Sequence, residues 1–244
     1  MKIVSIIPAR SGSKSIPNKN IIKLGKHPLI AYSIAESLLS QYIQETIVST
    51  DSENIADIAK KYGASVPYLR PEEISKDDST DKEFFQYHLD YLERNEMIVP
   101  DLIVHLRPTT PLREISVIDK AIERMMDNQE ATALLSAHKI RISPFKMFRL
   151  EGKYMVPFSR YSGIEESFGL PRQTFEDTYV QNGYVDVINP DILLNTGLLY
   201  GNKIEMWETA EVPDIDILSD YEGAKKQLSD FKFKHVIDYY TAPR

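Results

Sequence analysis

The sequence predicts an α/β protein with a mainly parallel sheet between two layers of helices. Short apolar runs alternate with amphipathic segments through about residue 137. The first apolar run, residues 3–7, ends at Pro8 and leads into a loop rich in small and basic residues. Open α/β sheets bind ligands at the carboxyl ends of their strands, so we expect the functional site to begin at this loop.

Five runs of β-forming residues are expected to build the sheet. Each is short and apolar, as strands buried on both faces should be. They are residues 3–7, 45–49, 102–106, 133–137 and 184–188. No internal repeat, low-complexity tract or linker interrupts the chain, so the sequence predicts a single domain over residues 1–244.

Four amphipathic helices are expected between the strands, each with apolar side chains at helical spacing. The first is predicted to begin with Pro28 as its first helical residue, and the second to follow Asp51 as its N-cap. The third should follow Thr80 or Asp81. The fourth carries an apolar stripe formed by Ile115, Ile118, Ile122 and Met125.

The alternation of strands and helices ends near residue 137. Residues 140–158 hold aromatic, methionine and basic side chains around a turn at Glu151–Gly152, which predicts a β-hairpin. Two interpretations remain open: an arm that seeks a partner, or a hairpin folded back on its own domain. Residues 162–171 are predicted to form a loop, and Ser219 with Glu222 to open a last helix through a capping box.

Composition excludes several classes of function. The chain has 244 residues, a formal net charge of −7 at pH 7 and no cysteine. The negative charge argues against a nucleic-acid binder, and the missing thiols exclude disulfides and cysteine nucleophiles. The first apolar run is too short for a secretory signal, and no later run is long enough for a membrane span, so we expect a cytoplasmic protein that binds no membrane.

The loop after the first strand has the composition of a polyphosphate-binding loop. Arg10, Lys14 and Lys19 bring three positive charges within ten positions. The small residues Ser11 and Gly12, together with further serines, let the backbone approach a ligand and offer hydrogen-bond donors. A solvated basic loop is the alternative, and the negative charge of the whole chain and the place of the loop after a buried strand count against it.

A pair of carboxylates, Asp214 and Asp216, is the second chemical feature. In an extended segment, residues two apart share one face, and two like charges so close repel unless a cation lies between them. Hard oxygen ligands suit Mg²⁺, which takes the rest of its shell from water and substrate phosphates. A solvated strand end is the alternative for the acid pair alone. The nearby polyphosphate loop favours the metal.

Seven segments carry a resemblance to a known family. The chain resembles the acylneuraminate cytidylyltransferases, the CMP-sialic acid synthetases, and more distantly the CMP-Kdo synthetases. The segments occur in the family's order and cover nearly the whole chain. They are PARSGSKSIPNKN (8–20), IVSTD (47–51), RPEEISKDDST (70–80), LRPTTPLR (106–113), PRQ (171–173), NG (182–183) and DID (214–216).

The resemblance implies a Rossmann-like three-layer α/β/α nucleotidyltransferase fold. It also implies a reaction in which the anomeric hydroxyl of a nine-carbon acidic sugar attacks the α-phosphate of CTP, giving a CMP-sugar and pyrophosphate with Mg²⁺ as cofactor. By the same analogy, residues 140–175 would be a small protruding arm that reaches the sugar site of the partner in a homodimer.

Site residues follow from the resemblance together with the loop chemistry. Arg10, Lys14 and Arg172 are expected to be catalytic, with Lys14 stabilising charge at the α-phosphate, and Asp214 and Asp216 are expected to hold Mg²⁺. The expected nucleotide contacts are Arg10, Ser11, Gly12, Lys14, Lys19, Asn20, Arg70 and Ser79. The expected sugar contacts are Arg107, Thr109, Gln173 and Asn182.

Two positions depart from the sialic acid pattern. Arg107 stands where those enzymes typically have Gln, and Val180 stands where several have Arg. Three roles for Arg107 remain open: a clamp on the sugar carboxylate, a reader of an altered substituent, or a partner of a local acid. The departures favour a legionaminic- or pseudaminic-type sugar at least as much as N-acetylneuraminate.

Three alternatives to this function are less well supported by the sequence. An eight-carbon sugar would make the protein a CMP-Kdo synthetase-like enzyme. A dinucleotide-dependent oxidoreductase is disfavoured, because the first loop lacks a GxGxxG pattern and holds cations in its place. A non-catalytic nucleotide-sugar binding protein is opposed by the presence of Lys14, Asp214 and Asp216.

Overall fold

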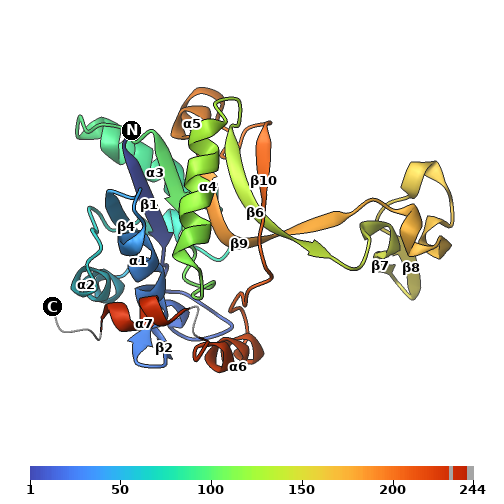
Figure 1. The fold of residues 1–244 in the computed structure, drawn as a ribbon, viewed down its shortest axis with the longest axis horizontal. Coiled ribbons are helices and arrows are strands. Elements are labelled where there is room, and N and C mark those ends of the chain that lie inside the picture. The colour runs from blue at the N-terminus through green and yellow to red at the C-terminus, as the bar shows by residue number, and fades with distance from the viewer. Residues whose placement is uncertain (231–232, 241–244) are drawn as a thin grey trace.

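The computed structural model describes residues 1–230 and 233–240. Figure 1 shows a body built around one twisted sheet and a narrow arm that projects from it. The predicted α/β class with a mainly parallel sheet is confirmed. Within the described residues, no helix combines the length and the hydropathy needed to span a bilayer.

The strands and helices are bounded as follows. The strands are β1 (Ile3–Pro8), β2 (Lys23–Leu24), β3 (His27–Pro28), β4 (Glu45–Ser49), β5 (Leu102–His105), β6 (Ala133–Ile140), β7 (Phe148–Glu151), β8 (Tyr154–Pro157), β9 (Thr178–Ile188) and β10 (Ile204–Glu208). The helices are α1 (Leu29–Leu39), α2 (Glu53–Lys61), α3 (Asp81–Arg94), α4 (Ile115–Asp127), α5 (Pro190–Thr196), α6 (Leu218–Gln227) and α7 (Lys234–Tyr239).

The central sheet has the strand order β10-β6-β9-β5-β1-β4 over the described residues. β1 pairs in parallel with β4 and β5, and β10 pairs in parallel with β6. β9 is antiparallel to both β5 and β6, and it joins the two parallel halves of the sheet. The carboxyl end of β1 therefore lies beside those of β4 and β5, as the prediction of a ligand site at this edge requires.

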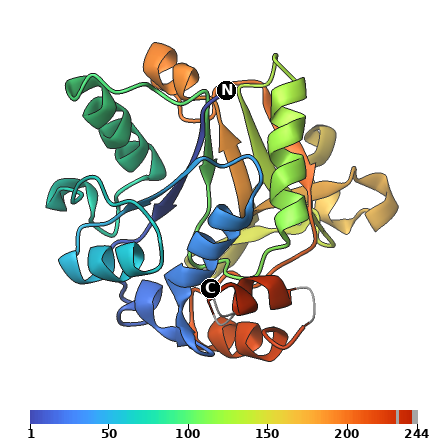
Figure 2. The same cartoon turned by 60° about the vertical axis from the view of Figure 1, so that its left-hand side comes forward.

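Alternating residues of β1 contact two different helix layers. Ile3 and Ile7 pack in the core on one face, together with residues of α1, α2 and α4. Val4 and Ile6 pack in the core on the other face, with α3 and α5. Figure 2 shows α3 and α4 on opposite sides of the sheet. The sheet is thus the middle layer of three, which explains why its strands are apolar on both faces.

A third apolar cluster attaches the C-terminal helices to the body. Ala224 of α6 and Val236 of α7 pack with Leu24 and Leu29 beside the first loop. Ile215, fully buried, belongs to the same cluster. The C-terminal part of the chain is thereby held against the segment that follows β1.

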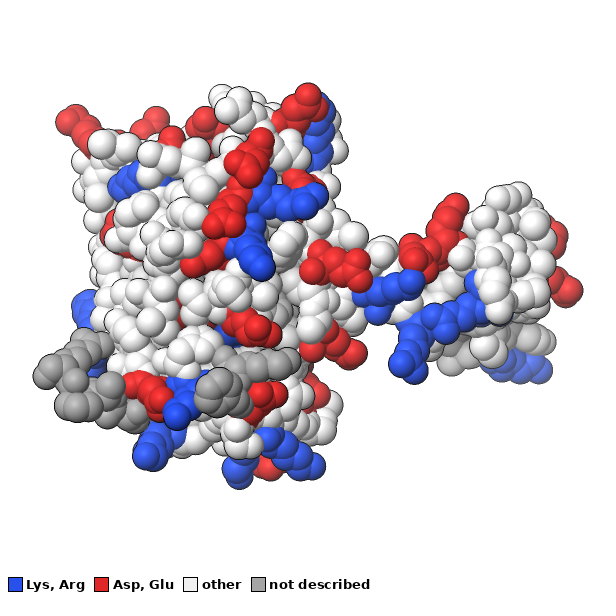
Figure 3. Space-filling model, viewed as in Figure 1, with Lys and Arg blue, Asp and Glu red and all other residues white. Residues whose placement is uncertain are grey.

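The hairpin predicted over residues 140–158 is present, and it lies at the end of the projecting arm. β7 and β8 pair antiparallel, with Gly152 at a φ of 61° in the turn that joins them. Extended β6 and β9 form the stalk that carries the hairpin away from the body (Figure 1). Figure 3 shows Lys and Arg side chains along the lower side of the arm and Asp and Glu side chains on its upper side and tip, and charges of both signs over the visible face of the body.

Four details of the predicted elements are wrong. Pro28 is the N-cap of α1 and not its first helical residue, and Ser52, not Asp51, caps α2. The last helix of the described residues is α7, which the sequence pattern did not indicate. Ser219 lies inside α6, whose first turn is capped by Asp220: its Oδ2 accepts from the backbone N–H groups of Asp216 at 3.0 Å and of Ile217 at 2.9 Å.

Candidate active site

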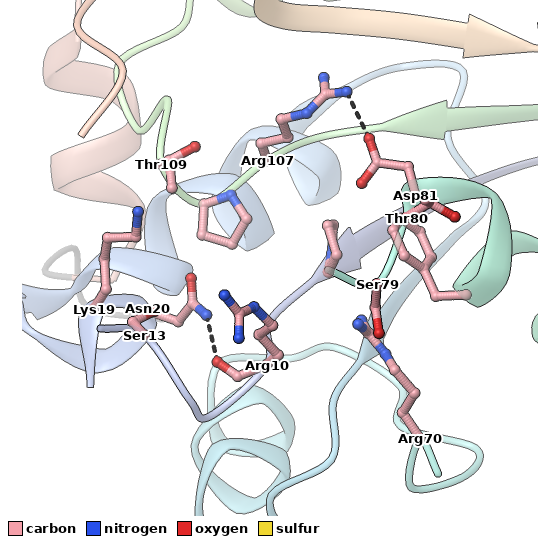
Figure 4. Close-up of a pocket in the computed structure, with 13 residues that line it drawn as sticks. Arg10, Ser13, Lys19, Asn20, Arg70, Ser79, Thr80, Asp81, Arg107 and Thr109 are labelled. Carbon is pink, nitrogen blue, oxygen red and sulfur yellow. Dashed lines mark hydrogen bonds and ion pairs between the residues drawn. The ribbon is translucent and has the colours of Figure 1, made fainter. Parts of the chain in front are cut away.

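A cleft opens at the carboxyl ends of β1 and β5 and at the start of α3 (Figure 4). Its volume is about 210 Å³. Polar side chains predominate in its wall, with Phe84 and two prolines as apolar members. The lining residues are Pro8, Arg10, Ser13, Lys19, Asn20, Arg70, Ser79, Thr80, Asp81, Phe84, Arg107, Pro108 and Thr109. Seven residues expected from the sequence therefore meet in one place, although they come from three separate motif segments, 8–20, 70–80 and 106–113.

The cations of the first loop are balanced by an acid from the loop before α3. Arg10 Nη1 lies 2.7 Å from Asp77 Oδ1, and the ammonium of Lys14 pairs with the other oxygen of the same carboxylate. The hydrogen bonds from Lys14 and Arg10 lower the pKa of Asp77. The Lys14 side chain is 84% exposed and lies outside the cleft wall.

Ser11 and Gly12 shape the loop and do not line the cleft. Ser11 donates to Asp51 twice, from its backbone N–H at 2.8 Å and from Oγ at 2.6 Å. This contact explains why Asp51 does not cap α2: its carboxylate is engaged by the first loop. The Gly12 carbonyl accepts from Arg10 Nη1 at 3.1 Å. Both residues thus hold the conformation of the loop that carries Arg10.

Asn20, Arg70 and Ser79 contribute to the wall of the cleft, Asn20 beside Lys19 and Arg70 beside Ser79 (Figure 4). Asn20 Nδ2 donates to the Arg10 carbonyl at 2.9 Å and so orients the first loop. Arg70 Nη2 donates to the Ser49 carbonyl at 2.7 Å, and its guanidinium lies 4.9 Å from the centre of the Phe84 ring. Burial lowers the pKa of Arg70. The wall combines a fixed cation, an aromatic ring and amide or hydroxyl groups.

The acid pair meets the first loop at the edge of the cleft. Lys19 Nζ lies 2.8 Å from Asp216 Oδ1, although the two residues are 197 positions apart. The Ile215 N–H donates to the Thr109 carbonyl at 2.7 Å. Asp214 and Asp216 are both exposed on either side of buried Ile215. Three of the motif segments, 8–20, 106–113 and 214–216, therefore converge on one spot.

The acid pair suits a metal that takes few protein ligands. Among the described residues, no group of three or more His, Asp or Glu side chains is placed to hold a metal ion. Two exposed carboxylates beside a cationic cleft are hard oxygen donors, and Mg²⁺ commonly uses one or two carboxylates and completes its shell with waters and substrate phosphates. Asp214 and Asp216 thus fit a metal that arrives with a polyphosphate.

Arg107 is held between two acids. Its Nη1 lies 2.7 Å from Asp186 Oδ2, and its Nη2 lies 3.0 Å from Asp81 Oδ2. Burial by itself would lower the pKa of Arg107, but Asp186 and Asp81 together raise it above its ordinary value. Of the three roles left open by the sequence, the structure shows the pairing with local acids. Neither acid was expected from the sequence as a partner of Arg107, because Asp81 lies 26 positions before Arg107 and Asp186 lies 79 positions after it.

A buried ion pair supports the loop that carries Arg107. Arg113 and Glu36 are fully buried, with Arg113 Nη1 2.7 Å from Glu36 Oε2. Arg113 Nη2 also donates to the carbonyls of Arg107 at 2.7 Å and Gly183 at 3.3 Å. Gly183 has a φ of 64°, and a Cβ there would lie 3.3 Å from the Arg107 side chain. Arg113 therefore positions two cleft segments at once.

Besides Lys14, three of the predicted sugar and catalytic residues do not line the cleft of this chain. Asn182 Nδ2 donates to Thr209 Oγ1 at 2.7 Å, and its Oδ1 accepts from the Tyr184 N–H at 3.2 Å, so its amide joins β9 to the segment after β10. Arg172 and Gln173 belong to a short 3₁₀ turn and line a separate hollow on the arm, next to Phe175.

Comparison with known proteins agrees with this arrangement. A family model of cytidylyltransferases matches residues 4–156. An N-acylneuraminate cytidylyltransferase of Escherichia coli is 30% identical over 241 residues, which cover 98% of this chain and 55% of the relative. A CMP-N,N'-diacetyllegionaminic acid synthase of Legionella pneumophila is 42% identical over 125 residues, which cover 50% of this chain and 53% of the relative.

A pseudaminic acid cytidylyltransferase of Campylobacter jejuni is 40% identical over 129 residues, which cover 53% of this chain and 55% of the relative. The chain thus spans about half the length of these curated relatives. Among solved structures, a CMP:2-keto-3-deoxy-manno-octonic acid synthetase complexed with CTP has a TM-score of 0.68 at 16% identity, over 94% of this chain and 99% of that one. At this identity the similarity shows the nucleotidyltransferase fold.

The family match covers the first loop, the wall residues Asn20, Arg70 and Ser79, and the segment with Arg107. The predicted resemblance is therefore confirmed at the level of the family, and the cleft lies inside the matched region. The chain belongs to the cytidylyltransferase family.

Proposed function

We propose that the protein transfers CMP from CTP to the anomeric hydroxyl of a nine-carbon acidic sugar and releases pyrophosphate. The observation that carries the proposal is the contact between Lys19 and Asp216, which joins the cationic loop to the acid pair at the mouth of one cleft. The names of the relatives, which include sialic, legionaminic and pseudaminic acid enzymes, support the sugar class. We propose that the protein acts in the cytoplasm, because a chain without cysteine is compatible with a reducing compartment.

The reaction requires the sugar hydroxyl oxygen to bond to the α-phosphorus of CTP while the bond from that phosphorus to the β-phosphate oxygen breaks. The hydroxyl proton leaves to solvent or to a phosphate oxygen. Such phosphoryl transfer needs in-line placement and neutralisation of charge on the phosphate oxygens. Arg10 and Lys19 lie in the cleft wall and would bind the triphosphate, and exposed Lys14 would close over the α-phosphate.

The nucleoside end of CTP would lie against the wall residues Asn20, Arg70 and Ser79. Arg70 is oriented by Ser49 and stacked on Phe84, so it is rigid before the ligand binds. Asp214 and Asp216 would hold Mg²⁺. When bound there with the nucleotide, the ion would withdraw negative charge from the phosphate oxygens.

The test is pyrophosphate release from CTP and Mg²⁺ with a panel of sugars: N-acetylneuraminate, legionaminate, pseudaminate and Kdo. ATP, GTP and UTP replace CTP as controls. We expect release with CTP and at least one nine-carbon sugar. Release only with Kdo would assign the eight-carbon alternative. If the protein binds CTP but releases no pyrophosphate with any of the sugars, the result would favour a nucleotide-sugar binding protein without catalysis.

Replacing Asp77 by Asn is expected to tighten CTP binding about three- to tenfold at low salt. The carboxylate now neutralises Arg10 and Lys14, and the triphosphate must displace it to reach them. The measurement is CTP titration at two ionic strengths, with Asp78→Asn as the matched control on the same loop. Weaker binding by the Asp77 variant would instead show that the acid orients the cations for CTP.

A homodimer would bring Arg172 and Gln173 to the sugar, because the arm carries them away from the cleft of their own chain (Figure 1). The arm also exposes apolar side chains, as an interface requires. Those at least 47% exposed on it include Ile142, Leu150, Tyr154, Met155, Phe158 and Ile164. We propose that a second copy of the chain covers them and that its cleft receives the arm.

The prediction from this arrangement is complementation between two inactive variants. Arg172→Ala and Asp216→Asn proteins should each lack activity, since one loses the arm contact and the other the acid pair. After joint refolding, about a quarter of the wild-type activity should return, because half of the dimers are mixed and each has one intact site. Lack of recovery, or a monomer in sedimentation, would contradict the shared site.

A further inference from the structure

The bridge formed by Asp81, Arg107 and Asp186 has one member that faces the cleft. The side chain of Asp186 is fully buried, and that of Arg107 is 21% exposed, whereas that of Asp81 is 40% exposed. Figure 4 shows the Asp81 carboxylate at the start of α3, with one oxygen joined to Arg107 and the other directed toward the open cleft. Among the described residues, only Oδ2 of Asp81 has a side-chain partner.

The terminal nitrogens of Arg107 are already engaged. Nη1 donates to Asp186 and Nη2 donates to Asp81, so both arms of the guanidinium fork are directed at protein carboxylates. An end-on bidentate clamp on a substrate carboxylate would use these same two nitrogens. Such a clamp would compete with both ion pairs, and loss of the inner pair would leave Asp186 buried without its partner, which is costly.

The net charge of the bridge also opposes a carboxylate. One arginine and two aspartates sum to −1. Gln181 adds a neutral donor to Asp186 Oδ2 at 3.2 Å, and His105 lies 3.7 Å away from the same oxygen. Burial, followed by the field of the neighbouring arginines, lowers the pKa of His105 well below its usual value, so it adds no positive charge near neutral pH. The carboxylates in this corner of the cleft accept hydrogen bonds, so the corner suits a hydroxyl or an N–H group of the ligand.

We infer that Asp81 determines sugar specificity: its free Oδ1 accepts a hydrogen bond from a hydroxyl or amide N–H of the acidic sugar, and Arg107 is a positioning residue that orients Asp81. The inference rests on the proposed function and deepens it. The sugar carboxylate then lies on the other side of the cleft, toward Arg10 and Lys19, the cations that the first loop contributes to the cleft wall.

The supporting contacts make the bridge rigid. Arg113 holds the Arg107 carbonyl, and Gly183 leaves only enough room for the Arg107 side chain to pass. Thr80, the N-cap of α3, together with Glu83 fixes the first turn that presents Asp81. A polar group oriented in this way discriminates strongly, because a sugar without the matching donor leaves the carboxylate desolvated and unpaired.

The test compares the full chain with its Asp81→Asn and Arg107→Gln variants in steady-state pyrophosphate release, using the panel sugar that the wild type converts. Asp81→Asn should lower kcat/KM for the sugar about 10- to 100-fold, the effect of losing a hydrogen bond to a charged acceptor, with KM for CTP within about twofold of wild type. Glu93→Gln, which changes an exposed carboxylate to an amide further along α3, should leave both constants unchanged.

Substrate analogues separate the two roles. Deoxy analogues of the sugar, each lacking one hydroxyl, and a des-acetamido analogue should include one that is poor for the wild type and is not penalised further by Asp81→Asn. Replacing the sugar carboxylate by a C1 carboxamide tests Arg107. The penalty of Arg107→Gln should be the same on the acid and on the amide, and the double variant should cost no more than Asp81→Asn alone.

Three results would overturn the inference. They are an unchanged kcat/KM for the sugar in Asp81→Asn, a change confined to KM for CTP, and an Arg107→Gln penalty that disappears with the carboxamide. The last would return Arg107 to the role of a carboxylate clamp. If the wild-type protein releases no pyrophosphate with any panel sugar, the proposed function itself is contradicted, and the inference falls with it.

Discussion

Replacing Arg113 by Met is expected to lower the free energy of unfolding by about 3–5 kcal/mol. Arg113 and Glu36 are fully buried and paired, and Arg113 also donates to the carbonyls of Arg107, Gly183 and Tyr184. The variant leaves these acceptors in the interior without a donor. Urea denaturation followed by circular dichroism measures the loss.

Two further variants serve as controls for the Arg113→Met prediction. Arg149→Met removes an ion pair with Glu151 whose side chains are 49% and 55% exposed, and it should change the free energy of unfolding by less than about 1 kcal/mol. Glu36→Leu combined with Arg113→Met removes both buried charges and should recover part of the loss. A loss for Arg113→Met no larger than that for Arg149→Met would show that the buried pair contributes little.

The loss should also depend on pH. Burial raises the pKa of Glu36 to about 8, against the attraction of Arg113. The folded protein therefore holds this proton more tightly than the unfolded chain, and rising pH between about 4.5 and 8 lowers stability. In Arg113→Met the pKa of Glu36 in the folded state rises further, because the attraction of Arg113 is lost. The stability of the variant therefore continues to fall above pH 8. The difference between wild type and variant should be larger at pH 9 than at pH 6, and an equal difference would argue against a buried Glu36 as its source.

Local patterns predicted the sheet well where a strand depends on its own residues. β4 has the predicted bounds, and β1 and β5 differ by one residue at one end, because buried parallel strands are continuous apolar runs. β10 was missed because its exposed and half-buried residues alternate at the sheet edge, without an apolar run. The antiparallel insertion of β9 depends on long-range pairing that no local pattern encodes.

The basic residues of the cleft could be predicted from the sequence, but the acids that pair with them could not. The basic loop after a buried strand indicated Arg10, and the resemblance to the family indicated Arg70 and Arg107. Their acidic partners were not foreseen, since Asp77 and Asp186 lie 67 and 79 positions away from Arg10 and Arg107. Such pairs form only when the sheet brings strand ends together, and spacing along the chain does not report them.

The place of the arm illustrates the same limit. The sequence of residues 140–158 predicted a hairpin correctly, because turn chemistry is local. Whether that hairpin returns to the body depends on the direction of its stalk, which the pairing of β6 with β9 determines. As a result, Arg172 and Gln173 were grouped with the cleft from their motif, whereas the structure of one chain separates them from it.

Replacing Asp216 by Asn is expected to lower kcat at least about 100-fold at millimolar Mg²⁺, while the fold remains intact. The side chain of Asp216 is 70% exposed, so its substitution opens no cavity in the core. The same substitution releases Lys19 from its ion pair at 2.8 Å. Freed Lys19 should keep or strengthen triphosphate binding, and KM for CTP should not rise in proportion to the loss of kcat.

This split between kcat and KM distinguishes a metal ligand from a simple structural acid. Activity is measured as a function of Mg²⁺ concentration for wild type, Asp214→Asn, Asp216→Asn and the control Glu222→Gln, which alters an exposed carboxylate on α6. Both aspartate variants should need more Mg²⁺ for half-maximal activity, and the control should not. An Asp216→Asn protein with an unchanged Mg²⁺ requirement would mean that Asp216 serves Lys19 alone and that the ion is held by the nucleotide without the acid pair.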